Sequence, residues 1–161
     1  GAGSYGKVYE GIYRDTQKVA YKVTRSQLSL EAIHETNILK TLHHPSIVRY
    51  IDVIHTSQHT LLVMELIDGG TMCDYIEKQY MKTNYWRDCE NMMIDVAYAM
   101  SYLHEKNIVH SDLKSDNILL RRNGKAVLSD FGLSSIIENS NSEIGESTTG
   151  TCLHIYIFSN Y

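Results

Sequence analysis

The sequence predicts an α+β fold in two unequal parts, a strand-rich part followed by a mainly helical one. Up to Leu66, β-branched and aromatic residues gather in short runs separated by polar turns, which is typical of strands. After Gly70, apolar residues recur at helical spacing instead. A chain of 161 residues, 43% hydrophobic and 21% charged, is also long and apolar enough to bury a core.

The first part alternates strand-like runs with polar turns and holds one helical stretch. Arg14–Lys18 is a polar turn between two runs of β-branched and aromatic residues. Ile38, Leu39 and Leu42 fall at helical spacing. His43-His44-Pro45 ends that helix, because the residue before a proline avoids the α region. The expected elements are a strand ending at Tyr13, a strand over Val19–Val23, a helix over Ser29–Leu42, and strands over Ile47–Ile54 and Thr60–Leu66.

The second part begins after Asp68-Gly69-Gly70, a turn or linker. Two short apolar runs, Ile118–Leu120 and Ala126–Leu128, flank Asn123-Gly124, which is typical of a β-hairpin. Residues 134–151 are rich in Ser, Thr, Asn and Gly and are expected to form a loop. Helices are expected near Met72–Lys78 and from about Asp88 to His104, the second with an apolar stripe of Met93, Val96, Ala97, Met100 and Leu103.

Charge and composition exclude several classes of protein. With 15 Lys+Arg against 19 Asp+Glu the net charge is −4, which argues against nucleic acid or an anionic membrane as the main partner. No apolar run approaches the roughly 20 residues of a membrane helix, and no secretory-signal pattern is present, so an intracellular, cytoplasmic protein is expected. Cys73, Cys89 and Cys152 lack CxxC spacing, and His55 and His59 lie in a turn, so no zinc site is expected.

A glycine-rich stretch opens the chain. Gly1-Ala2-Gly3-Ser4-Tyr5-Gly6-Lys7-Val8 has the pattern G-x-G-x-x-G-x-V, in which glycines let backbone N–H groups approach phosphate oxygens closely. A dinucleotide-binding turn would need a helix directly after Gly6, whereas Lys7–Tyr13 continues as a strand. Taken alone, the stretch is equally well explained as a plain glycine turn.

Further motifs follow in a fixed order: Val19-Ala20-Tyr21-Lys22, Glu35 on the expected helix, His110-Ser111-Asp112-Leu113-Lys114-Ser115-Asp116-Asn117, and Asp130-Phe131-Gly132. With the glycine-rich stretch, they make the chain resemble the protein kinase family from Gly1 to about Thr151. The resemblance implies a two-lobed kinase-like fold, with an antiparallel-sheet small lobe (about residues 1–64), a hinge (about 65–70) and an incomplete, mainly helical large lobe (about 71–161).

The resemblance implies that Lys22 holds the α- and β-phosphates of ATP and that Glu35 orients it through an ion pair. The segment from Lys22 to Glu35 is shorter than is usual in the family, so the start of the helix is abbreviated. An ordinary exposed position for Glu35 stays an alternative, because Glu31 lies one turn earlier on the same helix face.

By the same resemblance, four residues carry the chemistry and the metal. Asp112 would accept or orient the proton of the attacking hydroxyl, and Lys114 would neutralise the γ-phosphate in the transition state. Asn117 and Asp130 would supply oxygen ligands to Mg²⁺. The implied catalytic set is therefore Asp112, Lys114, Lys22 and Glu35.

The adenine ring is expected between Ala20, Met64 and Leu119, with hinge contacts from the backbone of Glu65–Ile67. These residues are equally compatible with a plain core role. The same matching implies that four side chains stack through both lobes, namely Leu39, Tyr50, His110 and Phe131. The residues expected to bind ATP are Gly1, Ala2, Gly3, Ser4, Tyr5, Gly6, Val8, Ala20, Lys22, Met64, Glu65, Ile67 and Leu119.

The substrate class depends on a narrower feature. Asp112-Leu113-Lys114-Ser115 resembles the loop of Ser/Thr kinases, particularly the tyrosine-kinase-like group, so protein substrates with Ser/Thr hydroxyls are expected. Ser111 replaces an arginine that in the family pairs with a phosphate on the activation loop, which puts that form of control in doubt.

The two ends of the chain also depart from the family pattern. The sequence opens at the first glycine, and after Gly150-Thr151 it leaves the pattern, so a kinase domain truncated at both ends is expected. An alternative function is therefore a nucleotide-binding but catalytically inert fragment that acts as an interaction module.

Overall fold

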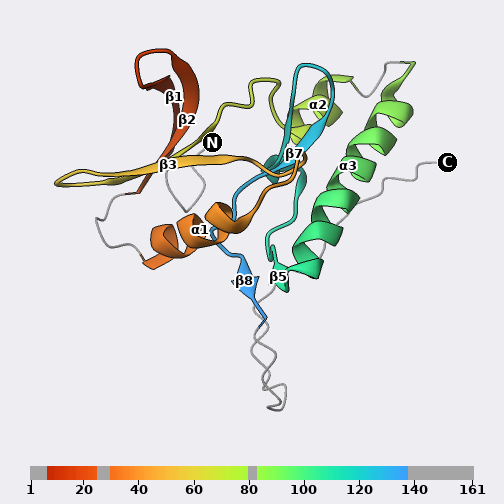
Figure 1. Ribbon diagram of the computed structural model, residues 1–161. Helices are drawn as coiled ribbons and strands as arrows, with labels where there is room; N and C mark the ends of the chain where they lie inside the picture. Colours follow the sequence, from red (N-terminus) through yellow and green to blue (C-terminus); the bar gives the residue numbers. More distant parts are fainter. Residues whose placement is uncertain (1–6, 25–29, 80–82, 138–161) are drawn as a thin grey trace.

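The computed structural model of the protein describes residues 7–24, 30–79 and 83–137. In these ranges a four-stranded sheet and one helix, α1 (Leu30–Thr41), form one part of the structure (Figure 1). The helices α2 (Met72–Gln79) and α3 (Tyr85–Glu105) form the other part, together with short strands. This is the predicted antiparallel sheet followed by a mainly helical part.

The sheet has the strand order β1-β2-β4-β3, and all its neighbouring strands are antiparallel. Its register places Ala20 opposite Met64, and Lys22 opposite both Val8 and Leu62. The strands are β1 (Lys7–Tyr13), β2 (Gln17–Thr24), β3 (Tyr50–His55) and β4 (Thr60–Glu65).

The helix α1 (Leu30–Thr41) packs against β3 and β4. It is one residue shorter at each end than predicted, and it ends ahead of Pro45 as expected. Ile38 and Leu39 are fully buried, so the helical spacing of these residues identified the inward face correctly.

The strand predicted from Ile47 begins only at Tyr50. Ile47 and Val48 are buried, but they lie beside Leu128 instead of beside the sheet: Ile47 forms a parallel bridge with Leu128, and the Val48 N–H donates to the Leu128 carbonyl oxygen at 2.9 Å. The Leu128 N–H in turn donates to the Ser46 carbonyl. An apolar run such as Ile47-Val48 is compatible with packing in the sheet and with packing beside Leu128. Sequence periodicity alone therefore does not reveal this connection between the two parts.

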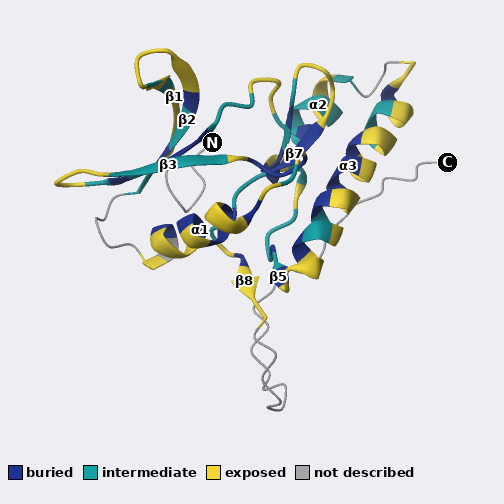
Figure 2. Cartoon of the chain, viewed as in Figure 1, coloured by how far each residue is buried: buried dark blue, intermediate teal, exposed yellow. Residues whose placement is uncertain are grey.

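The longest helix, α3 (Tyr85–Glu105), begins three residues earlier than predicted and follows α2 (Met72–Gln79). One side of α3 is buried and the other is exposed (Figure 2). The predicted inward positions Met93 and Ala97 are wrong, because both are exposed. The buried face consists of Tyr85, Met92, Asp95, Val96, Ala99 and Leu103.

Asp95 explains the error, because it places a carboxylate within the inward stripe of α3. Its side chain accepts hydrogen bonds from the Ala126 N–H and the Lys125 ammonium, each at 3.1 Å. A buried carboxylate is tolerated where donors of this kind satisfy it. Asp95 therefore connects α3 to the hairpin of β6 (Ile118–Leu120) and β7 (Ala126–Leu128), and the inward face includes a charged position that an apolar stripe does not predict.

The remaining elements frame the loops that follow α3. Strands β6 and β7 form the predicted hairpin, with Gly124 at φ +82° in the turn. Strand β8 pairs with β5 although a loop was predicted from residue 134, and residues 138–151 of that loop lie outside the described residues. The elements are β5 (Ile108–Val109), the 3₁₀ turn η1 (Ser115–Asn117), β6 (Ile118–Leu120), β7 (Ala126–Leu128) and β8 (Ser135–Ile136).

One hydrophobic cluster joins both parts of the structure. Leu39 of α1, Met64 of β4, Leu103 of α3, Leu128 of β7 and Phe131 all belong to it. The sheet and the helical part are thus held against each other by buried apolar surface. Within the described ranges, no helix combines the length and the apolar character needed to cross a membrane.

Candidate active site

The centre of the candidate site is a buried ion pair between Lys22 on β2 and Glu35 on α1. The Lys22 ammonium lies 2.8 Å from both carboxylate oxygens of Glu35, and both residues are buried. The predicted pairing is therefore present, and the alternative of an exposed Glu35 is wrong. The pair joins the sheet to its helix across 13 residues of sequence.

Asp130 contacts the same ammonium from the second part of the molecule. Its Oδ1 lies 2.8 Å from the Lys22 Nζ. Burial disfavours the ammonium, but the two carboxylates outweigh it and raise the pKa of Lys22. Burial would raise the pKa of Asp130, yet the Lys22 charge and the Gly132 N–H hold it below its ordinary range. Lys22 and Asp130 are therefore both charged at neutral pH.

A second cluster surrounds Asp112 in the loop between β5 and η1. The Lys114 ammonium lies 2.7 Å from Asp112 Oδ2, and the buried Asn117 amide donates to the same oxygen at 2.9 Å. Asn117 also donates to the Asp112 backbone carbonyl at 2.8 Å. The carboxylate is thus oriented by two donors from its own loop, while Lys114 itself is exposed.

The buried His110 side chain holds this loop through two hydrogen bonds. Its Nε2–H donates to the Ser129 carbonyl at 2.9 Å, and its Nδ1 accepts from the Asp112 N–H at 3.3 Å. Because both nitrogens are used in this way, the ring is neutral, and burial lowers its pKa. The ring also lies edge-on to Phe131, with 4.8 Å between the ring centroids.

The four side chains expected to stack through the molecule are found close to one core. Leu39 and Phe131 belong to the same buried cluster, and the half-buried Tyr50 packs against that cluster. His110 is fully buried against Phe131. The loops that carry Asp112 and Asp130 therefore lie against a buried, largely apolar cluster.

Two residues of the site have left-handed backbone conformations. Ser111 has φ +64° and Asp130 has φ +62°, in a region that non-glycine residues seldom occupy. Such conformations cost on the order of 1–3 kcal/mol and persist where the surroundings determine them. Here they turn the chain just before Asp112 and at Asp130, two of the three carboxylates of the site.

The expected ATP-binding residues are described only in part. Gly1, Ala2, Gly3, Ser4, Tyr5 and Gly6 lie outside the described residues. Met64 is buried, Ala20 and Leu119 are half-buried, and Val8 is exposed on the edge strand β1. The register brings Ala20 beside Met64, whereas Leu119 comes from the β6–β7 hairpin of the other part.

The hinge segment has partners that sequence reasoning missed. Arg121 donates to both carboxylate oxygens of Glu65, each at 3.0 Å, and Arg122 lies 2.7 Å from the carboxylate of Asp68. The sequence signal for these pairs was weak. It consists of two successive arginines after a predicted strand and of two acids three positions apart in the hinge. Charges at such separations in sequence do not identify partners without the fold.

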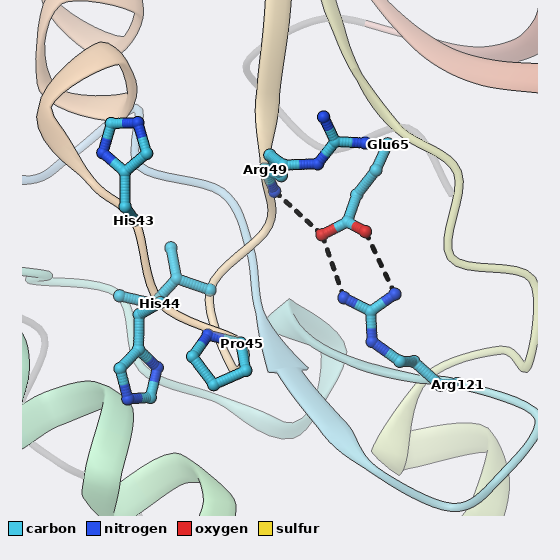
Figure 3. Close-up of a pocket in the computed structure, with 7 residues that line it drawn as sticks. His43, His44, Pro45, Arg49, Glu65 and Arg121 are labelled. Carbon is cyan, nitrogen blue, oxygen red and sulfur yellow. Dashed lines mark hydrogen bonds and ion pairs between the residues drawn. The ribbon is translucent and has the colours of Figure 1, made fainter. Parts of the chain in front are cut away.

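A cavity of about 320 Å³ lies beside this hinge (Figure 3). It does not include Lys22, Asp112, Asn117 or Asp130. Figure 3 shows the Glu65 carboxylate between the Arg49 backbone and the Arg121 guanidinium at its edge. The lining residues are His43, His44, Pro45, Ile47, Arg49, Glu65 and Arg121.

The donor set fits a hard cation held jointly with phosphates. Both Asn117 contacts to Asp112 use the amide nitrogen, which leaves the amide oxygen for a cation. Asp130 supplies a carboxylate, and such oxygen ligands suit Mg²⁺. Among the described residues no group of three or more His, Cys, Asp or Glu is placed to hold a metal ion.

Comparisons with known proteins give one family. The family model "Protein kinase domain" matches residues 1–156. The probable serine/threonine-protein kinase kinX of Dictyostelium discoideum is 33% identical over 150 residues, which cover 89% of this chain and 14% of that protein. The tyrosine-protein kinase Fer of Mus musculus is 34% identical over 138 residues, 83% of this chain and 17% of Fer.

A plant relative extends the comparison. The probable LRR receptor-like serine/threonine-protein kinase At1g05700 of Arabidopsis thaliana is 35% identical over 158 residues, 94% of this chain and 18% of that protein. The chain thus spans less than a fifth of the length of each of these three relatives. With the family model matching nearly the whole sequence, and with the antiparallel sheet and the helical part in the expected order, the chain belongs to the protein kinase family.

Proposed function

We propose that this domain transfers the γ-phosphoryl group of ATP, with Mg²⁺, to Ser and Thr hydroxyls of protein substrates. The observation that carries the proposal is the convergence of Lys22, Glu35 and Asp130 in one ion-pair cluster, beside a separate cluster of Asp112, Lys114 and Asn117. Phosphoryl transfer needs positioning and charge neutralisation more than covalent help. The two clusters are suited to it, because they hold charged side chains in fixed positions through ion pairs and hydrogen bonds.

In the proposed reaction, the acceptor hydroxyl oxygen bonds to the γ-phosphorus while the bond from that phosphorus to the β,γ-bridging oxygen breaks. Asp112 takes the hydroxyl proton, and its carboxylate is held for this by the Asn117 amide. Lys114 stabilises the charge on the transferring group, and Lys22 holds the remaining phosphates. Mg²⁺ bound through Asn117 and Asp130 would neutralise phosphate charge. The products are ADP and a phosphorylated side chain.

The preference for Ser/Thr is the narrower part of the proposal. It is supported by the Lys114-Ser115 pair in the loop and by relatives named as serine/threonine kinases. Fer, named as a tyrosine kinase, is equally similar. We include a cytoplasmic location in the proposal, because ATP and Mg²⁺ are supplied there.

The test is a phosphotransfer assay with a generic basic protein, followed by identification of the phosphorylated amino acid, alongside titration with Mg-ATP. Asp112→Asn should lower turnover by a factor on the order of 10² or more while leaving ATP affinity nearly unchanged. The matched control is Asp116→Asn, since Asp116 is an exposed acid four residues further on, in η1. Equal turnover in Asp112→Asn would refute the role of Asp112, and phosphotyrosine as the only product would refute the Ser/Thr preference.

A nucleotide-binding but inert interaction module is the second candidate. The exposed side of α3 favours it, because Trp86, Ile94 and Tyr98 present large apolar side chains there. Binding of Mg-ATP without any phosphotransfer by the 161-residue chain would support this candidate for the chain as it stands.

A further inference from the structure

The carboxylate of Glu65, at the end of β4, connects three segments of the chain. It receives two parallel hydrogen bonds from the Arg121 guanidinium, both at 3.0 Å, and a third from the Arg49 backbone N–H at 2.9 Å (Figure 3). The Glu65 N–H also donates to the Arg49 carbonyl at 3.0 Å. A bidentate arginine–carboxylate contact is geometrically specific and among the stronger hydrogen-bonded pairs.

The hinge that follows Glu65 is tied to β6 through the backbone as well. The Gly69 N–H donates to the Leu120 carbonyl and the Leu120 N–H donates to the Gly70 carbonyl, each at 2.9 Å. A Cβ on Gly69 would lie 2.3 Å from the Leu120 carbonyl oxygen, so the two backbones approach as closely as glycine allows. Glu65–Arg121 is therefore the side-chain component of a continuous seam between the hinge and the β6–β7 hairpin.

The two arginine pairs of this seam differ in exposure. The Glu65 side chain is 15% exposed and Arg121 is 34% exposed, whereas Asp68 is 42% and Arg122 is 82% exposed. Exposed ion pairs contribute little because water and salt screen them, and partly buried bidentate pairs contribute more. Replacing Arg121 should therefore affect the hinge more than replacing Arg122, and Arg122 is the matched control.

The Glu65–Arg121 pair lies next to the expected adenine site in sequence, so its loss should affect nucleotide binding. Glu65 directly follows Met64, and Arg121 lies two residues after Leu119, so each partner is adjacent to one side of that site. The pair therefore adds a side-chain contact at Glu65 to the backbone bonds that connect the later part of the hinge to β6. Neither carboxylate nor guanidinium needs to touch the nucleotide for this effect.

We infer that Arg121 is a positioning residue for nucleotide binding: through its bidentate contact with Glu65 it holds the hinge backbone at the spacing that an adenine base requires. This inference rests on the proposed function, because it assumes that adenine binds between the hinge and Leu119. It goes beyond that proposal by assigning a role to a residue outside the kinase motifs.

The test measures the affinity of the 161-residue chain for adenosine and for Mg-ATP by calorimetric titration. Arg121→Ala should weaken both ligands by the same factor, roughly tenfold, because the defect concerns the site of the base. Arg122→Ala should change neither by more than about twofold. Lys22→Met should weaken Mg-ATP but not adenosine, since Lys22 is expected to contact phosphates only.

A second pair of variants separates positioning from simple destabilisation. Glu65→Gln keeps an oxygen for the Arg49 N–H but loses the charge, and should weaken adenosine as Arg121→Ala does. The double variant should be no weaker than either single one, because both remove the same contact. If Arg121→Ala does not fold, Arg121→Lys, which lacks the bidentate contact, should still show part of the loss.

Wild-type adenosine affinity in folded Arg121→Ala would overturn the inference and leave the proposed function intact. Losses in Glu65→Gln and Arg121→Ala that add in the double variant would overturn it in the same way. Failure of the folded wild-type chain to bind either adenosine or Mg-ATP would instead overturn the nucleotide site itself, and the inference with it.

Discussion

The Lys22 ammonium touches the Asp130 carboxylate at 2.8 Å, although the two residues are 108 positions apart in sequence. One is proposed to hold phosphates and the other to hold Mg²⁺, so in this conformation each neutralises the other. Phosphates and a metal ion arriving together would supply both with new partners of opposite charge. The contact therefore keeps the two groups charged and close before ligands bind.

Changing Lys22 to Met should abolish productive ATP binding while keeping most of the side-chain volume. The change also leaves buried Glu35 without its ammonium partner, and removing one member of a buried pair typically costs about 3–5 kcal/mol. Lys22→Met/Glu35→Gln removes the stranded charge and should recover part of the stability but none of the binding. Mg-ATP titration and urea unfolding check this, and wild-type affinity in either variant would refute the role of Lys22.

The stability of the fold should fall as the solution is acidified below about pH 6.5, and His110 should contribute to the fall. Its pKa lies below its ordinary value of 6.5 because burial disfavours the charged ring, and this outweighs the Ser129 carbonyl and the carboxylates of Asp130 and Asp112, which favour it. Between the unfolded and folded pKa values the unfolded chain binds more protons, so the free energy of unfolding decreases as pH falls. The contribution of one such group reaches at most about 1.4 kcal/mol per pH unit.

His110→Gln provides the comparison, because glutamine can still donate to Ser129 but does not titrate. Urea unfolding between about pH 5 and 8 should show lower stability at neutral pH and a shallower dependence on pH than in the wild type. An unchanged slope would mean that other groups carry the acid sensitivity.

Met92 and Met93 should respond differently to truncation, because Met92 is 2% exposed and Met93 is 37% exposed. Met92→Ala should cost about 2–5 kcal/mol of stability, since it opens a cavity under α3. Met93→Ala should cost about 0.5 kcal/mol. Denaturant unfolding of the two variants tests the register of α3, and equal losses would contradict it.

Activity should depend only weakly on phosphorylation of the loop after Asp130, because Ser111 offers no bidentate partner for a phosphate. Phosphatase treatment of an active form should therefore change phosphotransfer less than about twofold. Ser111→Arg should introduce a stronger dependence at no added backbone strain, since serine already occupies φ +64° there. Loss of wild-type activity on dephosphorylation would show that Ser111 was misinterpreted.

Sequence reasoning succeeded where a residue's role depends on local pattern. The order of strands and helices and the Asn123-Gly124 hairpin depend on neighbouring residues, and both are confirmed. Lys22 and Glu35 are distant in sequence, but the motifs identified the pair through the family resemblance. Their roles toward ATP stay predictions.

Sequence reasoning failed where a tertiary contact overrides the local pattern of residues. Asp95 is buried because the Ala126 N–H and Lys125 satisfy it, which no property of the helix sequence reveals. Ile47 pairs with Leu128 and not with the sheet, and Arg121 pairs with Glu65, which lies 56 positions earlier in the sequence. Each of these contacts joins segments whose proximity only the folded chain establishes.

Trp86, the only tryptophan of the chain, stands on the exposed side of α3 next to Tyr85. Indole emission shifts to shorter wavelength when water is replaced by an apolar contact, so the protein carries an intrinsic optical probe at this position. Emission at long wavelength is expected for the chain alone, and a blue shift would signal that a partner has covered this side of the helix.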